Sequence, residues 1–248
     1  MNWDGEFAFV AEGVVFRGWA ADNRAHRHAT VQITLGLDGP VTILDVSKGR
    51  AVTDSALLVR PGVMHALQPG GKVWLVLLQP ESLLAQHMLQ RSKQEGVVSL
   101  PPEFVEGVHV IAPLANSLDG MRKPHKAVQI HDERLLKALK FLESVRGARP
   151  VERAATAVGL SVSRLRGLAQ AHLEIPLARW LTLRQLQRAV QAMAQGASIA
   201  EAAIDAGFAD QAHLTRQMRK TLGITPAMVE ALTRESPRRF IQDTRHRQ

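Results

Sequence analysis

The sequence predicts an α+β protein with a small β-barrel in its first half and an all-α second half containing two helix-turn-helix units. Three observations carry this prediction. Short runs rich in Val, Ile and Leu alternate with glycine and proline turns in the first half. One pattern of capping, small and apolar residues occurs twice in the second half. The excess positive charge of the chain lies entirely in that second half.

Length and composition limit the class of protein. A chain of 248 residues, 46% of them hydrophobic, is long enough for two domains with buried cores. The absence of cysteine excludes disulfides, cysteine-based metal sites and thiol chemistry. No run is long and apolar enough to cross a membrane, and the first ten residues lack the basic segment of a secretory signal. We therefore expect a cytoplasmic protein that does not contact membranes.

The first half, residues 1–80, contains short segments with the composition of β-strands. Turns such as Asp38-Gly39-Pro40 and Pro69-Gly70-Gly71 separate these segments. Short strands at regular spacing favour a barrel or a sandwich, and a closed sheet has no exposed edges. The expected strands are residues 14–19, 31–37, 41–46, 56–59 and 73–78.

Residues 81–125 are expected to be a helical region that follows the barrel. One helix is predicted from Pro80 to about Lys93, and a second from about Pro102 to Leu118, because apolar residues recur at helical spacing. These helices could pack on the barrel, pair two subunits, or do both. Residues 119–126 combine glycine, proline and charge, so they are the best linker candidate.

The helix-turn-helix pattern is clearest at residues 198–228. Ser198 and Glu201 form a capping box that begins a helix, and Gly207 ends this helix. Asp210 caps the next helix, in which apolar residues recur every four positions on the inner side. Two short helices around a glycine turn form a helix-turn-helix unit.

The outer face of that second helix carries side chains suited to contacts with DNA. Arginine and glutamine can hydrogen-bond to base edges in the major groove, and a small alanine lets the helix approach closely. Taken alone, the pattern would equally suit an amphipathic helix with a solvated basic face. The predicted DNA contacts are Gln211, Ala212, Thr215, Arg216, Arg219 and Lys220.

Residues 153–177 repeat the pattern, which favours the DNA-binding interpretation. Ala154 and Ala155 correspond to Ala202 and Ala203. A helix predicted at residues 177–195 joins the two units and spans roughly 28 Å at about 1.5 Å per residue. Neighbouring major-groove faces of B-DNA are about 34 Å apart, so both units can contact one duplex. In the first unit the predicted DNA contacts are Ser163, Arg166 and Gln170.

The distribution of charge supports the same interpretation. Residues 1–130 contain 12 Lys and Arg and 12 Asp and Glu, whereas residues 131–248 contain 19 and 11. The net charge of +8 therefore belongs to the half with the repeated unit. Neutralisation of DNA phosphates requires such a segregated basic region. The basic residues after Arg234 are expected to form an irregular tail that touches phosphates.

Residues 131–234 resemble the tandem helix-turn-helix domain of AraC-type bacterial transcription regulators. The resemblance is carried by HLTRQMRK at residues 213–220 and LGITP at residues 222–226. The first unit matches less well, since Glu174 replaces a usual glycine and Gly167 replaces an arginine that often reads bases. The resemblance implies binding to double-stranded DNA as a homodimer, control by a small-molecule effector, and contact with RNA polymerase if the protein is an activator.

The first half resembles the cupin domain that precedes this module in such regulators. His26 and His28 followed by Gln32 match the first cupin motif, with glutamine in place of glutamate, and His65 matches the second. In metal-binding cupins these positions are ligands, so the four residues could hold Zn²⁺, Ni²⁺ or Fe²⁺. The favoured interpretation is that they line the barrel mouth and form hydrogen bonds there without a metal, and no cofactor is required. The resemblance places an effector pocket inside the barrel, with Trp19, His26, His28, Gln32, His65 and Trp74 as candidate contacts.

Three functions follow from these observations. The favoured one is a transcription regulator, not an enzyme, in which an effector stabilises one placement of the DNA-binding units. The alternatives are a constitutive DNA-binding dimer, whose barrel only dimerises, and a metal-dependent cupin enzyme fused to a DNA-binding module.

Overall fold

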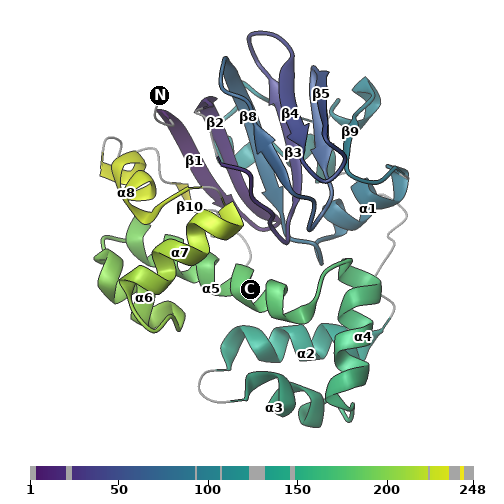
Figure 1. Cartoon of the computed structure of the whole chain (residues 1–248), viewed down its shortest axis with the longest axis vertical. Coiled ribbons are helices and arrows are strands. Elements are labelled where there is room, and N and C mark those ends of the chain that lie inside the picture. Colours follow the sequence, from purple (N-terminus) through teal and green to yellow (C-terminus); the bar gives the residue numbers. More distant parts are fainter. Residues whose placement is uncertain are drawn as a thin grey trace.

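The computed structural model describes residues 4–20, 24–92, 94–106, 108–122, 132–145, 149–222, 224–234 and 241–242. A sheet-rich domain comes first and a helical domain second, as the sequence predicts (Figure 1). Among the described residues, no helix is long and apolar enough to cross a membrane.

The cupin-like domain contains two sheets. The five expected strands are present within about two residues of their predicted bounds, and the structure adds β1, β5, β7, β9 and β10. All described strand pairs are antiparallel except that of β10 with β1. The larger sheet has the order β10 (Ile241–Gln242), β1 (Asp4–Val10), β2 (Gly13–Trp19), β8 (Lys72–Leu78), β3 (Val31–Gly36), β6 (Ala56–Val59), β9 (Val97–Ser99). The smaller sheet has the order β5 (Arg50–Asp54), β4 (Val41–Asp45), β7 (His65–Leu67).

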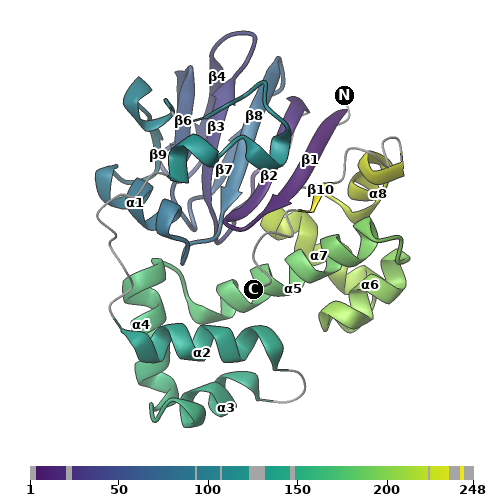
Figure 2. The ribbon, with the colours of Figure 1, turned by 180° about the vertical axis from the view of Figure 1, so that it is seen from behind.

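The two faces of the larger sheet belong to different cores, because successive side chains of a strand point to opposite faces. Phe7 and Phe9 of β1 and Leu75 of β8 face the smaller sheet and the helical domain. Trp74 and Val76 of β8 face the opposite way, towards α1 (Leu83–Arg91) and the segment after β9. The inner face therefore meets the helical half, whereas the outer face is covered by α1 and by described residues between Leu100 and Met121 (Figure 2).

The predicted helix from Pro102 to Leu118 is wrong. The structure has only short 3-10 turns there: η1 (Pro102–Phe104), η2 (Leu114–Asn116) and η3 (Asp119–Arg122). Pro113 has no backbone N–H and would clash with the preceding turn of an α-helix. Leu114 and Leu118 are nevertheless buried against the outer face of the larger sheet. Of the predicted linker, residues 123–126 lie outside the described residues, as does most of the predicted C-terminal tail.

The helical domain contains seven α-helices among the described residues. The first unit packs around the first half of α5, and the second unit around its second half. In order, the helices are α2 (Glu133–Ser144), α3 (Pro150–Ala157), α4 (Val162–Leu173), α5 (Leu177–Ala194), α6 (Ile199–Ala206), α7 (Gln211–Leu222) and α8 (Pro226–Arg234).

The helical domain does not form a single core. Leu177, Trp180 and Leu183 at the start of α5 are buried with α2, α3 and α4. Further along α5, Leu186 and Met193 are buried in the core that also contains the inner face of the larger sheet. The second helix-turn-helix unit thus shares its core with the cupin-like domain.

Candidate DNA-binding surface and effector pocket

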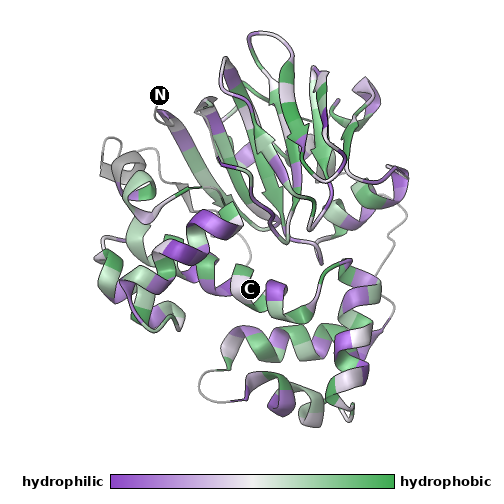
Figure 3. Cartoon of the chain, viewed as in Figure 1, coloured by the Kyte–Doolittle hydropathy of each residue, from purple (hydrophilic) through white to green (hydrophobic). Residues whose placement is uncertain are grey.

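Helix α7 has the expected amphipathic arrangement. The Asp210 carboxylate accepts a hydrogen bond from the His213 backbone N–H at 2.6 Å and so caps the helix. Leu214 and Met218 are fully buried, which fixes the helix on its inner side. The hydrophilic stretches of α7 are visible in Figure 3. Of the predicted contacts on this helix, Gln211, Ala212, Arg216, Arg219 and Lys220 are exposed and Thr215 is half-buried.

Thr215 differs from the other predicted contacts. Its hydroxyl donates a hydrogen bond to the Gln211 carbonyl at 2.9 Å, one helical turn earlier. The hydroxyl hydrogen is therefore used within the helix, and the oxygen and methyl group remain for contact with DNA. Thr215 is suited to apolar contact or to accepting a hydrogen bond.

Helix α4 presents the matching surface of the first unit. Its N-cap is Ser161, whose hydroxyl accepts from the Arg164 backbone N–H at 3.1 Å. The predicted contacts Ser163, Arg166 and Gln170 are all exposed. A side chain added at Gly167 would meet no atom within 4 Å, so this exposed glycine serves no packing purpose. The two candidate recognition helices, α4 and α7, lie towards opposite ends of α5 (Figure 1).

A cavity of about 150 Å³ lies between the cupin-like domain and the second helix-turn-helix unit. We call it the interdomain pocket. Its walls are apolar, and none of its lining residues in the described chain is Lys, Arg, Asp or Glu. The polar lining residues are His26, His28, Thr30, Gln32 and Gln187. The lining residues are Phe7, Phe9, Val14, Phe16, His26, His28, Thr30, Gln32, Leu75, Leu77, Leu183, Leu186, Gln187, Val190, Leu222, Ile224, Met228 and Val229.

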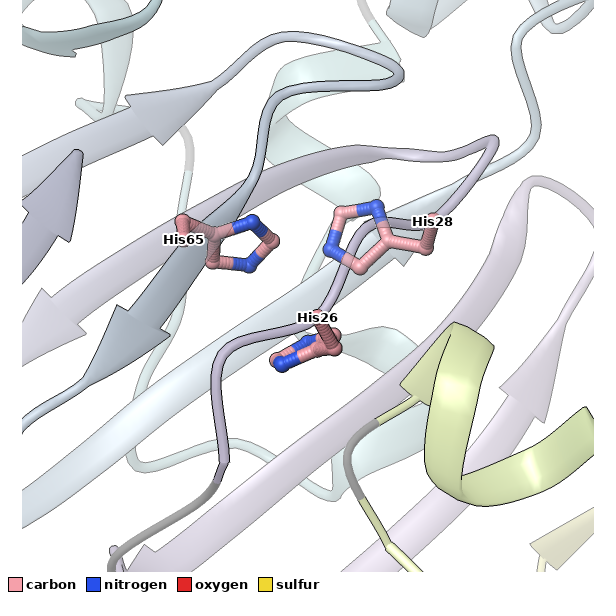
Figure 4. A group of neighbouring side chains, drawn as sticks. All are labelled: His26, His28 and His65. Carbon is pink, nitrogen blue, oxygen red and sulfur yellow. The ribbon is translucent and has the colours of Figure 1, made fainter. Parts of the chain in front are cut away.

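At the polar end of the pocket, the structure brings together the four residues of the cupin-like motif. The backbones of His26 and His65 form a β-bridge with hydrogen bonds of 2.9 Å in both directions. Ring centroids of His26, His28 and His65 lie 4.5–5.6 Å apart (Figure 4). The Gln32 Oε1 atom lies 2.9 Å from His28 Nε2 and 3.3 Å from His65 Nε2. His26, His28 and Gln32 also line the pocket, with His65 behind them.

The three imidazoles are neutral at pH 7. Burial lowers the pKa of His26. Burial, reinforced by the neighbouring His26, lowers the pKa of His28 to about 4. Burial and the two other rings hold the pKa of His65 well below its usual value. Each ring therefore carries one proton, leaving one nitrogen lone pair on each.

Neither of the two tryptophans predicted to contact an effector lines the interdomain pocket. Trp19 is 48% exposed and lies under the Lys72 ammonium group, 5.2 Å from the ring centroid. Trp74 is fully buried but points to the outer face of the larger sheet. The sequence analysis missed the aromatic residues Phe7, Phe9 and Phe16, although the alternation of Phe7 and Phe9 was a signal for a strand with one apolar face.

Polar contacts also join the cupin-like domain to the first unit. Arg60 donates two hydrogen bonds, of 2.7 and 2.9 Å, to the Glu174 carboxylate at the end of α4. Glu81, at the start of the segment leading into α1, accepts from the Trp180 indole at 3.0 Å and forms an ion pair with Arg184. Both helix-turn-helix units therefore contact the cupin-like domain, the first through polar groups and the second through apolar ones.

Glu174 has an unusual backbone conformation for its residue type. Its φ of 59° and ψ of 12° lie in the left-handed region, where glycine is favoured. The resemblance described above also expects glycine here. The ion pair with Arg60 gives glutamate a role at this position that glycine could not fill.

Comparisons with known proteins agree with this geometry. A family model described as a helix-turn-helix domain matches residues 154–231. No curated protein sequence shows significant similarity. A crystal structure of ToxT from Vibrio cholerae superposes with a TM-score of 0.54 at 11% identity, covering 94% of this chain and 98% of that one. ToxT with a bound unsaturated fatty acid gives 0.55 at 9% identity, with 94% and 96% coverage.

A further similar structure is a transcriptional regulator from Chromobacterium violaceum, described as containing an AraC-type DNA-binding domain. It is 23% identical with a TM-score of 0.38, covering 41% of this chain and 92% of that one. Residues 154–231 therefore match a helix-turn-helix domain, and the chain shares the fold of ToxT, with a sheet-rich domain ahead of the helical one.

Proposed function

We propose that this protein is a transcription regulator that binds specific DNA sequences through α4 and α7 and responds to a small apolar effector in the interdomain pocket. The observation that carries the proposal is the composition of the pocket wall. One side is the inner face of the larger sheet, and the other is formed by α5, α8 and the segment between α7 and α8. A molecule bound there contacts the sensing domain and the second DNA-binding unit simultaneously.

The size of the pocket suggests the kind of effector. An apolar cavity of about 150 Å³ is large enough for a molecule the size of benzene. A similar structure holds an unsaturated fatty acid, which supports an effector with a largely apolar body. A long chain would need more room, and the second unit would have to move away from the sheet to provide it. A compact effector would stabilise the present arrangement, whereas a larger one would change it.

The regulatory effect follows from these contacts. An effector shifts an equilibrium only by the difference between its affinities for the two states. Here that difference arises because Leu222, Ile224, Met228 and Val229 of the second unit, together with four residues of α5, line the pocket opposite the sheet. The effector would thereby change how α7 is placed relative to α4, and hence the affinity for a two-part operator. We include a homodimer in the proposal, with each subunit contributing one α4 and α7 pair.

The experiment begins with selection of bound sequences from a random DNA pool. Affinity for the selected operator is then measured with and without small apolar compounds. Val190→Phe, which fills the pocket from α5, should keep effector-free DNA binding and lose the response. Val46→Phe, an equal enlargement at a residue that does not line the pocket, should keep both. Failure to enrich any sequence would contradict sequence-specific DNA binding. If Val190→Phe responds to the compounds as wild type does, the effector does not bind in the interdomain pocket. The spacing of half-sites tests the dimer.

A further inference from the structure

The histidine cluster has a protonation pattern that its hydrogen bonds determine. His26 Nδ1 lies 2.9 Å from the Arg24 carbonyl, His28 Nδ1 3.0 Å from the Thr30 carbonyl, and His65 Nδ1 3.0 Å from the Val63 carbonyl. A carbonyl oxygen can only accept, so a proton on each Nδ1 satisfies these contacts, and the Thr30 hydroxyl, 2.9 Å from His28 Nδ1, can accept from the same N–H group. A neutral ring has one N–H group, and therefore all three Nε2 atoms present lone pairs.

These lone pairs meet another acceptor. The Gln32 amide nitrogen donates to the Thr34 hydroxyl at 3.0 Å, which directs the amide oxygen towards His28 Nε2 and His65 Nε2. Two acceptors at 2.9 Å without a proton between them repel each other, and the side chains of Gln32, His28 and His65 are all buried. A cation at the centre would turn this repulsion into attraction. Rotation of the amide by 180° would also relieve it, by placing N–H groups against the rings.

We propose that the Nε2 atoms of His26, His28 and His65, together with Gln32 Oε1, bind a divalent transition metal ion, and that this ion holds the acidic group of an effector in the interdomain pocket. Three imidazoles and an oxygen suit zinc and its neighbours among the transition metals. The backbone carbonyls that accept from each Nδ1 supply the outer contacts that orient histidine ligands in metal sites.

The spacing of the ligands is close to what such an ion needs. The ligand atoms of the three histidines lie within 4.8 Å of one another. Bonds of about 2.0–2.1 Å to the four protein ligands place the ligand atoms roughly 3.4 Å apart, and the acidic group of the effector would be a fifth ligand. Binding would therefore draw the rings inward. His26 and His65 are already joined by their backbone bridge, so little rearrangement of the chain is required.

The second part of the inference rests on the proposed function and identifies the class of effector. A carboxylate buried without a cation is strongly unfavourable, and the residues that line the interdomain pocket include no Lys or Arg. His26, His28 and Gln32 line the pocket, so an ion that they hold faces it. The metal would then supply the positive charge for a compact aromatic or branched carboxylic acid, with the apolar body against Val190 and Met228.

The metal site is tested with protein purified without a polyhistidine tag and stripped with a chelator. Titration with Co²⁺ should produce visible absorption bands that saturate at one equivalent, and Zn²⁺ should abolish them. His65→Ala should remove the bands, whereas His109→Ala, which removes an exposed histidine elsewhere, should leave them. Binding of less than about a tenth of an equivalent by the folded wild-type protein would overturn the site.

A second variant, Gln32→Glu, distinguishes a metal site from a metal-free cluster in which the Gln32 amide is rotated. It remains informative even if His65→Ala fails to fold. A carboxylate cannot donate hydrogen bonds, so in a metal-free site it would face three lone pairs, and the protein should melt at a lower temperature than wild type. With Zn²⁺ the order should reverse, because the carboxylate is a better metal ligand than the amide. A Gln32→Glu protein that melts lower both with and without Zn²⁺ would overturn the proposal in favour of a hydrogen-bonded cluster.

The effector part is tested by calorimetry with benzoate and benzyl alcohol, which have similar apolar bodies and differ in charge. Zn²⁺ should tighten benzoate binding at least tenfold and leave benzyl alcohol unchanged. Equal benzoate affinity with Zn²⁺ and with chelator would overturn this part. The proposed function is tested by a different result: it predicts that neutral apolar compounds alter the affinity for the operator even when a chelator removes the metal.

Discussion

At Glu174, which forms an ion pair with Arg60, the effects of backbone strain and of charge on the free energy of unfolding can both be measured. Two substitutions are compared in the full-length protein. Glu174→Gln removes the charge and keeps a side chain in the left-handed region, whereas Glu174→Gly removes both the charge and the strain. The difference between the two variants therefore reports the strain that glycine relieves minus the cost of its greater freedom in the unfolded chain.

The expected magnitudes follow from the geometry. The left-handed conformation costs a residue with a Cβ atom about 1–2 kcal/mol. Glycine avoids that cost but loses roughly 0.5–1 kcal/mol through its greater freedom in the unfolded chain. Glu174→Gly should thus be more stable than Glu174→Gln by up to about 1.5 kcal/mol. The Glu174 side chain is 42% exposed, so the ion pair itself contributes at most about 1 kcal/mol.

The assay is urea unfolding followed by tryptophan fluorescence. Trp180 is buried one turn into α5, beside the contact with Glu81, and reports on this side of the interface. Glu174→Gln should unfold at the lowest urea concentration, with wild type and Glu174→Gly close together. Arg60→Gln combined with Glu174→Gln should show a coupling energy of 0 to about 1 kcal/mol. A Glu174→Gly protein less stable than Glu174→Gln would refute the reasoning about strain.

Further predictions concern DNA binding, helix stability and pH. Arg216→Ala should cost about 1–3 kcal/mol on the selected operator and relax the preference at one base position; equal losses on operator and random DNA would contradict base reading. Arg219→Ala or Lys220→Ala should weaken binding to all sequences alike and reduce the salt slope by about one, measured by titration at several salt concentrations. Gly167→Ala should raise the free energy of unfolding by about 0.5–1 kcal/mol, since the position is an open helix interior; thermal melting tests this, and a lower melting temperature would contradict it. In chelator, stability should fall as the pH drops from 6.5 to about 4, because unfolded His28 takes a proton that the folded side chain resists; His28 alone accounts for about 3 kcal/mol, and stability independent of pH over that window would show that its pKa is not lowered.

The sequence predicted the helical half well because its signals are local. Ser198 with Glu201 forms the expected capping box, and Gly207 ends α6 with a φ of 89°. Strands β2, β3, β4, β6 and β8 were also predicted, since runs of Val, Ile and Leu between glycine turns need little long-range information, whereas β1, β5, β7 and β9 were not. The segment around Pro113 was misjudged because apolar spacing was given more weight than the proline.

The candidate site was only partly predictable. The histidines and Gln32 were identified from a short motif, and the structure brings them together. The remaining pocket wall comes from β1, β2, β8, α5 and α8, which are distant in sequence. No periodicity shows that Val190 and Phe9 face the same cavity. Trp74 shows a further difficulty. Side chains alternate between the two faces of a strand, so a shift of one residue in the assumed alternation assigns a side chain to the opposite core.

The core shared by the second helix-turn-helix unit and the N-terminal sheet determines which parts of the chain unfold together. Helix α5 is embedded at its start among α2, α3 and α4, and at its end against β-strands from the beginning of the chain. The units that unfold cooperatively are therefore expected to combine segments that are distant in the sequence. Residues 133–183 would melt as one block, and α6 and α7 would melt with the sheet formed by the N-terminal half. Truncating the protein between its apparent halves would expose the large apolar face beneath Leu186 and Met193, so separately expressed halves are expected to aggregate unless they are produced together.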